Sequence, residues 1–284
     1  MASPPVLTPS GTTGFNRETW QNNLEQPTYQ RMVAIPTFDE YPGRVLNVGH
    51  IRKHARATAT TLTQSADGDS LTASDITGTP ITLTPVGRYV YVSWSENEDA
   101  QVEVNLDSEA AGNIEQALAE ASDAAGLANA TSLTQIMSQA AVDATMFRQA
   151  YGRLIGNMNG VAMPGDGPTV YAIFHNTQYP NLMNIPEFTA ANVRGDSENP
   201  HVKGIWGKGN GVQLMLSTVV AQDANGWHNI MYVSSAFVVG WNVRSRTKRQ
   251  DYLLNNRIIV FNNFATAVKH DLRAIDMRTT VSGL

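Results

Sequence analysis

The segment from residue 50 to residue 95 alternates as β-strands do, yet much of it is polar and rich in threonine. Ala57 and Ala59 alternate with threonines, and Ile81 and Leu83 do the same after a turn-rich stretch. A period of two residues is typical of strands, so the sequence predicts a long two-stranded excursion. A hairpin of only two strands is marginally stable in water. This excursion must therefore either move freely or lie on another molecule.

The residues before this excursion predict an extended arm. Prolines recur through residues 1–45 and prevent a long helix there. Only residues 17–22 fit a short helical segment. Because an extended arm buries little surface by itself, it also needs something to lie against.

Apolar residues recur three, four and seven positions apart from Ile114 to Ala128. This period predicts a long, alanine-rich helix that begins near Asp107 and has an acidic, solvated outer face. A second helix is expected over residues 145–158.

The remaining sequence mixes strand patterns, a short helical pattern and a long polar loop, which indicates an α+β chain. Strands are expected at residues 90–94, 101–106, 169–174, 212–220, 229–233, 237–241 and 258–264, with a strand-like tail over 265–280. The short helix is expected at 179–185 and the loop at 187–211.

Charged residues are scarce. They make up 16% of the chain, against about 25% in an average soluble domain. Surfaces buried between proteins are depleted in charge. Composition alone leaves two explanations open: a monomer with a surface of small polar residues, or a subunit that other subunits cover.

Several classes of protein are excluded or disfavoured by composition. The chain has no cysteine, which excludes disulfides, thiolate metal sites and a thiol nucleophile. A formal net charge of −5 disfavours a general nucleic-acid binder. No apolar run approaches the roughly 18 residues that span a bilayer, and the polar start does not look like a secretory signal. We therefore expect no membrane partner and folding in a cytosol.

No motif assigns the chain catalytic residues, a cofactor or a metal. The glycines between Gly204 and Gly211 lack the spacing of a phosphate-binding loop and predict a mobile surface loop. His50 and His54 lack the H-E-x-x-H pattern, and each of the other histidines is expected to be structural. No G-x-S-x-G elbow is present. A protein that is not an enzyme is expected.

Acidic and basic residues are segregated along the chain. From Tyr89 to Phe147 there are ten acidic residues and no lysine or arginine, whereas Trp241 to Leu284 contains eight basic and three acidic residues. Complementary charges give specificity and register to contacts. Contacts within one chain and contacts between subunits both fit this distribution.

The order and lengths of these parts resemble the major capsid protein of tailed bacteriophages, the Hong Kong ninety-seven coat fold. Residues 57–95 are similar to the family's extended loop, and Asp107 to Ala130 is similar to its spine helix. Residues 145–182 are similar to the start of its axial domain, and residues 258–277 to its closing strands. The resemblance implies an N-terminal arm (1–45), an extended β-hairpin loop (46–95), a peripheral domain with the spine helix (96–140), a mixed α/β axial domain (141–257) and closing strands that return to the peripheral domain (258–284).

The resemblance also implies a function. Subunits of this family form pentamers and hexamers that close into an icosahedral shell around double-stranded DNA, without sequence-specific binding. The expected location is the virion, after assembly in the host cytoplasm. Only about 45 residues precede the β excursion, so a separate scaffolding protein is an expected partner, together with a portal and a decoration protein.

Contacts between subunits are expected at the tip of the extended loop and in a loop of the axial domain. The candidate interface residues are Thr63, Asp67, Asp69, Lys203, Trp206 and Lys208.

Three alternatives stay open from the sequence. An encapsulin, which is a bacterial cargo compartment, has the same fold. A β-rich adhesin or tail-associated binding module belongs to another class of function. An enzyme is the third alternative, because mixed α/β chains host many activities.

The sequence makes one prediction about covalent chemistry. One relative crosslinks its shell through isopeptide bonds from a lysine on the extended loop, but no lysine lies between Lys53 and Lys203 in this chain. Assembled particles should therefore run on denaturing gels as one band near 30.9 kDa. A ladder of covalent multimers would contradict this prediction.

Overall fold

The computed structural model describes residues 32–43, 45, 49–54, 78–95, 106–158, 169–185, 208–209, 212–252 and 255–280. Some sequence predictions lie outside these residues, namely the arm up to residue 31 with its short helix, the strands at 57–61 and 101–105, and most of the loop at 187–211. No helix of the described residues is long and apolar enough to cross a membrane.

The contacts divide the described chain into two compact units. Unit 1 contains residues 87–121 and 245–262, and unit 2 contains the other described residues from 33 onward. The domain boundaries implied by the family resemblance stay predictions.

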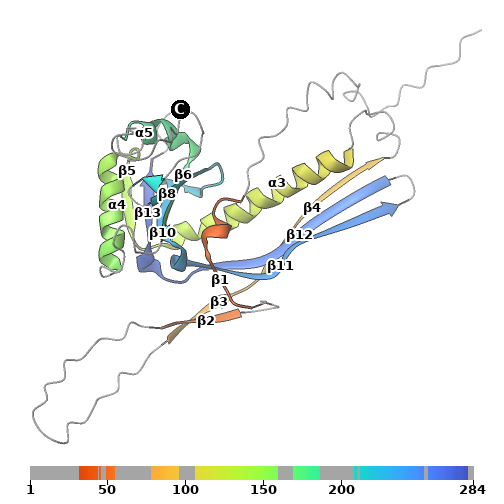
Figure 1. Ribbon diagram of the computed structural model, residues 1–284, viewed down its shortest axis with the longest axis horizontal. Helices are drawn as coiled ribbons and strands as arrows, with labels where there is room; N and C mark the ends of the chain where they lie inside the picture. The colour runs from red at the N-terminus through yellow and green to blue at the C-terminus, as the bar shows by residue number, and fades with distance from the viewer. Residues whose placement is uncertain are drawn as a thin grey trace, which may run out of the picture. The chain divides into compact units, whose positions relative to one another are not determined.

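The elements keep the numbering of Figure 1. The helices are α3 (Leu106–Leu127), α4 (Ala144–Asn157) and α5 (Tyr179–Met183). The strands are β1 (Asp39–Glu40), β2 (Gly49–His54), β3 (Gly78–Leu83), β4 (Val86–Ser95), β5 (Ile136–Gln139), β6 (Val170–His175), β7 (Lys208–Gly209), β8 (Val212–Ser217), β9 (Gln222–Asp223), β10 (Gly226–Val233), β11 (Phe237–Tyr252), β12 (Asn255–Val268) and β13 (Ala274–Thr279). The three helices confirm those predicted from periodicity, within a few residues at each end.

Unit 2 is built on a mixed sheet with the order β5-β13-β10-β6-β8-β7. Strands β6 and β8 are parallel, as are β13 and β5, whereas β10 is antiparallel to both of its neighbours. Helix α4 packs on one face, where Phe147 and Leu154 share a core with Phe174, Met231 and Ile275. Figure 1 shows this helix beside the sheet.

The start of α4 has a side-chain cap. The backbone N–H of Met146 donates to the carboxylate of Asp143 over 2.6 Å. This contact satisfies one of the N–H groups that have no partner inside the first turn of a helix. The cap and the buried positions Met146, Phe147, Ala150 and Leu154 explain why periodicity located this helix correctly.

The other face of the sheet is covered by residues 33–38, which the sequence assigned to the extended arm. Phe38 stacks on Phe237 with ring centroids 4.9 Å apart and meets the edge of Tyr232 at 5.8 Å. The hydroxyl groups of Thr37 and Tyr232 share a hydrogen bond. This part of the arm therefore lies against its own chain.

The acidic face predicted for the long helix is wrong at Asp123, which is 2% exposed. Its carboxylate accepts hydrogen bonds from the backbone N–H groups of Val33, Ala34 (3.1 Å) and Ile35 (3.2 Å). Burial raises the pKa of Asp123, and the N–H donors oppose this rise. The carboxylate can be buried at this position because three backbone N–H groups donate hydrogen bonds to it.

Gly126 lets the same segment approach α3 closely. A Cβ atom at Gly126 would lie 2.8 Å from Ile35 Cδ1 and 3.1 Å from Phe38 Cε2. Helix α3 continues through Gly126 to Leu127, and the missing side chain makes room for the apolar side chains of residues 35 and 38.

Strands β2 and β3 form a separate two-stranded ribbon, as the sequence predicted. They pair antiparallel from Gly49 opposite Leu83 to His54 opposite Gly78. The ribbon is anchored at one end, because Leu83 is fully buried in a cluster with Val45, Val238 and Ala265. The chain between residues 54 and 78 lies outside the described residues.

The prediction that the excursion continues to residue 95 is wrong, because β4 belongs to another sheet, whose order is β1-β11-β12-β4. Trp94 of β4 packs with Ile114 and Leu118 of α3 and with Val260 of β12. Unlike the threonine-rich strands, β4 has an apolar face that a helix covers. The strand predicted up to residue 106 is also wrong at its end, because Leu106 begins α3.

Strands β11 and β12 are longer than predicted. The sequence predicts strands at residues 237–241 and 258–264, whereas the observed strands extend over residues 237–252 and 255–268. Residues 242–252 are mostly polar, so no apolar alternation marked them. The tail predicted as continuous strand from 265 to 280 is instead broken by a 3₁₀ turn at Asp271–Arg273 before β13.

The contact of Asp123 predicts a clear effect on stability. Replacing Asp123 by alanine leaves three backbone N–H groups without an acceptor, and the free energy of unfolding should fall on the order of 3 kcal/mol. Asp123→Asn keeps one acceptor oxygen and should lose less. Denaturant unfolding followed by circular dichroism measures both changes. A loss below about 1 kcal/mol for the alanine variant would contradict the role given to this carboxylate.

Candidate functional site

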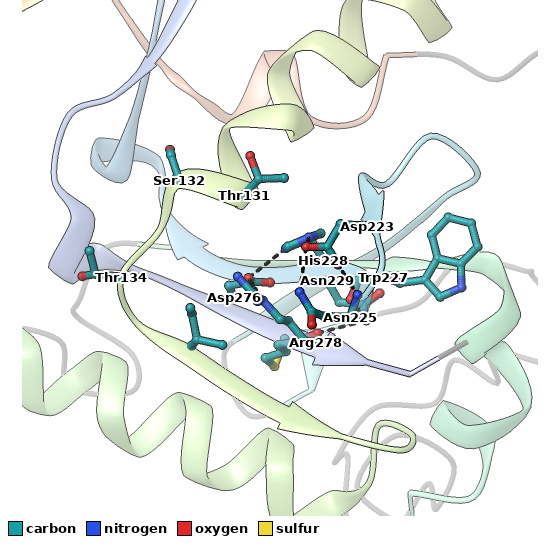
Figure 2. Close-up of polar contacts among 12 residues, drawn as sticks. Thr131, Ser132, Thr134, Asp223, Asn225, Trp227, His228, Asn229, Asp276 and Arg278 are labelled. Atoms are coloured by element: carbon teal, nitrogen blue, oxygen red, sulfur yellow. Dashed lines mark hydrogen bonds and ion pairs between the residues drawn. The ribbon is translucent and has the colours of Figure 1, made fainter. Parts of the chain in front are cut away.

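Polar side chains gather around the turn between β9 and β10, at one end of the sheet of unit 2 (Figure 2). His228, Asn229, Asp276 and Thr279 are fully buried there. Buried polar groups are costly without partners, so their contacts decide what this cluster does.

His228 lies between two carboxylates, as Figure 2 shows. Its Nδ1 lies 2.9 Å from Oδ2 of Asp276, and its Nε2 lies 3.2 Å from Oδ2 of Asp223. Arg278 donates from Nε to the same oxygen of Asp276 over 2.7 Å. These contacts connect β9, β10 and β13.

Asn229 connects three strands with one side chain. Its Oδ1 accepts from the backbone N–H of His175 in β6 over 2.8 Å. Its Nδ2 donates to the carbonyl oxygen of Met277 (3.1 Å) and to Oγ1 of Thr279 (2.9 Å) in β13. The amide therefore holds β6, β10 and β13 together at this end of the sheet.

An aromatic stack lies at the same end. The imidazole of His175 stacks on the indole of Trp227, with centroids 3.5 Å apart and planes 6° apart. Nδ1 of His175 also lies 2.8 Å from Oγ1 of Thr177. Burial lowers the pKa of His175, which favours its neutral form.

The turn itself requires specific residues. The carboxylate of Asp223 accepts from the backbone N–H of Asn225 over 2.7 Å and from its side-chain amide over 3.1 Å. Gly226 has a φ of +125°, and a Cβ atom there would lie 1.9 Å from the carbonyl oxygen of Thr279. Only glycine fits this close approach.

The geometry of this cluster is structural rather than catalytic. His228 is fully buried, and its ring nitrogens face acidic side chains instead of a hydroxyl nucleophile. Within the part of the chain that the structure describes, no group of three or more histidine and acidic side chains is suited to a metal ion. The cluster fixes one end of the sheet in unit 2.

A second candidate site is the exposed face of β4 in unit 1. Tyr89 is 74% exposed and Tyr91 is 46% exposed. Val90, Val92 and Trp94 alternate with them and pack toward α3. The alternation locates the strand, but it does not reveal that two aromatic rings stay exposed on the other face, which is a feature of contact surfaces.

Most of the interface residues predicted from the sequence lie outside the described residues. These are Thr63, Asp67, Asp69, Lys203 and Trp206. Lys208 lies in β7, opposite Gln213 of β8 and at one edge of the sheet of unit 2. The predicted loop is therefore wrong at Lys208 and Gly209, where the backbone pairs with β8. All six residues stay predictions as interface residues.

Solved structures from phages resemble this chain, and several of them are capsid structures. The capsid structure of cyanophage P-SCSP1u matches with a TM-score of 0.64 and 12% identity, over 93% of this chain and 95% of that one. Microbacterium phage Oxtober96 matches with 0.66 and 13%, over 98% and 96%. Mycobacterium phage Bobi matches with 0.61 and 16%, over 92% and 94%. The chain therefore has the capsid fold that the resemblance implied.

The similarity is structural. No family model matches the sequence, and no curated protein matches it.

The carboxylate at the β9–β10 turn predicts a dependence of stability on pH. The N–H of Asn225 lowers the pKa of Asp223, and His228 adds to this effect. A lowered pKa means that the charged carboxylate stabilises the fold above the ordinary aspartate pKa of about 4, and that this contribution disappears as the pH falls through the lowered value. Asp223→Asn should lower the melting temperature at pH 7.

The difference in melting temperature between the wild type and Asp223→Asn should shrink as the pH falls below about 4. Differential scanning calorimetry across this range measures the difference. If it stays constant with pH, the charge of Asp223 does not contribute to stability.

Proposed function

We propose that this chain is the major capsid protein of a tailed bacteriophage, and that it assembles as pentamers and hexamers into an icosahedral shell around double-stranded DNA. The observation that carries the proposal is the capsid fold, which extends over most of the chain and is shared with several phage capsid structures. A fold hosts many functions in general, so the features below add separate support.

The ribbon of β2 and β3 supports a role in assembly. Its base is anchored in unit 2 through Leu83 and Ile51, while the sequence between residues 54 and 78 is polar and rich in threonine. Such a segment cannot form a core of its own. In a shell it extends across a neighbouring subunit, which provides the surface that it needs.

The surface composition supports the same role. Charged residues make up 16% of the chain, and Tyr89, Tyr91 and Leu272 are large side chains with at least 46% exposure. In a closed shell every copy uses the same surface patches for its contacts with neighbouring subunits. Many weak contacts between such patches, which carry few charges, together stabilise the particle.

The DNA and the remaining partners follow from the same proposal. A net charge of −5 limits non-specific binding of phosphates, which suits a container whose DNA must move. The proposed protein acts in the virion by assembly rather than by catalysis, and assembles in the host cytoplasm. A separate scaffolding protein, a portal and a decoration protein are its proposed partners.

The decisive variant shortens the ribbon without disturbing its paired base. Residues 58–74 are replaced by a short glycine–serine turn, which retains the pairing of β2 with β3 between residues 49–54 and 78–83. The wild type should sediment as closed particles, and the variant as soluble subunits with unchanged circular dichroism. Normal particles from the variant would contradict the role given to the ribbon.

The content of the particles separates the proposed function from its alternatives. Particles purified from infected cells should protect double-stranded DNA from nuclease. A specific protein cargo without DNA would indicate an encapsulin. A wild-type protein that stays monomeric or trimeric at every concentration would indicate a binding module.

A further inference from the structure

The turn between β9 and β10 contains an asparagine that is followed directly by a glycine, Asn225 and Gly226. Two further asparagine–glycine pairs, at residues 159–160 and 210–211, lie outside the described residues. Asparagine is a thermally labile residue. It is most reactive before glycine, because glycine has no side chain to shield its backbone nitrogen from the neighbouring amide. Asn225 is exposed, so water reaches this pair.

The reaction open to this pair is deamidation through a cyclic imide. The backbone nitrogen of Gly226 loses its proton to solvent base and attacks Cγ of Asn225, so a new C–N bond forms. The bond between Cγ and Nδ2 then breaks, and Nδ2 takes up a proton from water and leaves as ammonia. Water opens the resulting succinimide at either carbonyl group, which yields aspartate or isoaspartate at position 225. Water is the only co-reactant that this sequence of steps consumes.

The carboxylate of Asp223 binds the amide of Asn225 in the folded turn (Figure 2). Its Oδ1 accepts a hydrogen bond from the backbone N–H of Asn225 over 2.7 Å, and its Oδ2 accepts one from Nδ2 over 3.1 Å. The backbone contact lowers the pKa of Asp223, so the acceptor is charged at neutral pH. The amide is therefore bound to a group other than the nitrogen that attacks it.

The attacking nitrogen is restrained as well. Gly226 lies opposite Asp223 in the ladder of β9 and β10, and a Cβ atom at Gly226 would lie 1.9 Å from the carbonyl oxygen of Thr279 in β13. Intramolecular reactions are fast only when the reacting atoms approach to about 3–3.5 Å in the right orientation. Closing the ring moves the amide or Gly226, and each movement breaks contacts of this turn.

We propose that Asn225 is a site of spontaneous deamidation, and that Asp223 is the positioning residue that sets the rate of this reaction in the folded protein. While the carboxylate binds the amide, the reaction proceeds only through local opening of the turn. The inference is independent of the proposed function, because it uses only contacts within one chain.

Deamidation changes the surroundings of Asp223. It replaces the Nδ2 donor by a carboxylate, so a second negative charge takes the position 3.1 Å from Oδ2 of Asp223. Like charges at such a distance repel each other. The isoaspartate product also lengthens the backbone by a methylene group beside Gly226, where Thr279 leaves no space. Because Asp223 also lies 3.2 Å from Nε2 of His228, the modification weakens the contact of this turn with β10.

The rate of deamidation at Asn225 tests the proposal in the full-length protein. Chymotryptic cleavage after Leu216 and Trp227 releases a peptide in which Asn225 is the only asparagine. Mass spectrometry measures the conversion of this peptide during incubation of the protein at neutral pH. The folded protein should react at least about tenfold more slowly than the same chain unfolded in guanidinium chloride. Equal rates would overturn the proposal, because the folded turn would then exert no control.

Substitution of Asp223 tests its positioning role. The quantity compared is the ratio of the folded rate to the unfolded rate, which cancels any effect of the substitution on the unfolded chain. Asp223→Ala removes both acceptors and should raise this ratio about tenfold. Asp223→Asn keeps one acceptor oxygen and should give an intermediate ratio. The matched control is Gln222→Ala, because Gln222 is the exposed neighbour in β9, and it should leave the ratio unchanged.

Circular dichroism checks that each variant is folded. If the Asp223 variants are folded and their ratio equals that of the wild type, the role given to Asp223 is overturned. If Asp223→Ala does not fold, the comparison of Asp223→Asn with Gln222→Ala decides in the same way. A ratio that rises equally in Gln222→Ala would also overturn the proposal, because the rate would then depend on the turn in general and not on the carboxylate.

Discussion

The buried carboxylate of Asp123 is the contact on which the packing of residues 33–38 against α3 depends. It gathers the backbone N–H groups of Val33, Ala34 and Ile35 at the end of α3. The absence of a side chain at Gly126 then lets Ile35 and Phe38 pack on the helix. Burying this charge is costly, and burial raises the pKa of Asp123. The three N–H donors offset that cost, so the helix and the segment that precedes the ribbon are stable only together.

Buried polar side chains also connect the strands of the unit 2 sheet. Asn229 connects β6, β10 and β13, and His228 lies between carboxylates of β9 and β13. The hydrogen bonds of the buried Asn229 amide favour one arrangement of these strands, because any other leaves a buried polar group unpaired. Such rigidity suits the proposed role, in which every copy presents the same patches.

Periodicity predicted the elements whose burial repeats along the sequence. The helices α3 and α4 and the strands β6 and β10 each bury a regular set of apolar residues, and their positions were confirmed. The extension of β11 through polar residues could not be predicted from the sequence. There the strand is stabilised by its backbone pairing with β12, and its side chains show no apolar alternation that would indicate a strand. Asp123 was assigned to a solvated face because a helix pattern does not reveal which distant N–H groups meet a carboxylate. The partner of β4 was assigned wrongly for a related reason, since alternation indicates a strand but not its neighbour.

The proposed function requires that copies of this chain assemble with one another into a closed shell. Electron microscopy of the purified full-length protein tests this claim most directly, over a range of protein and salt concentrations. Closed shells of uniform diameter are expected, in which the density of each subunit matches the capsid fold. A well-folded protein that stays monodisperse as a monomer or small oligomer under all these conditions would contradict it.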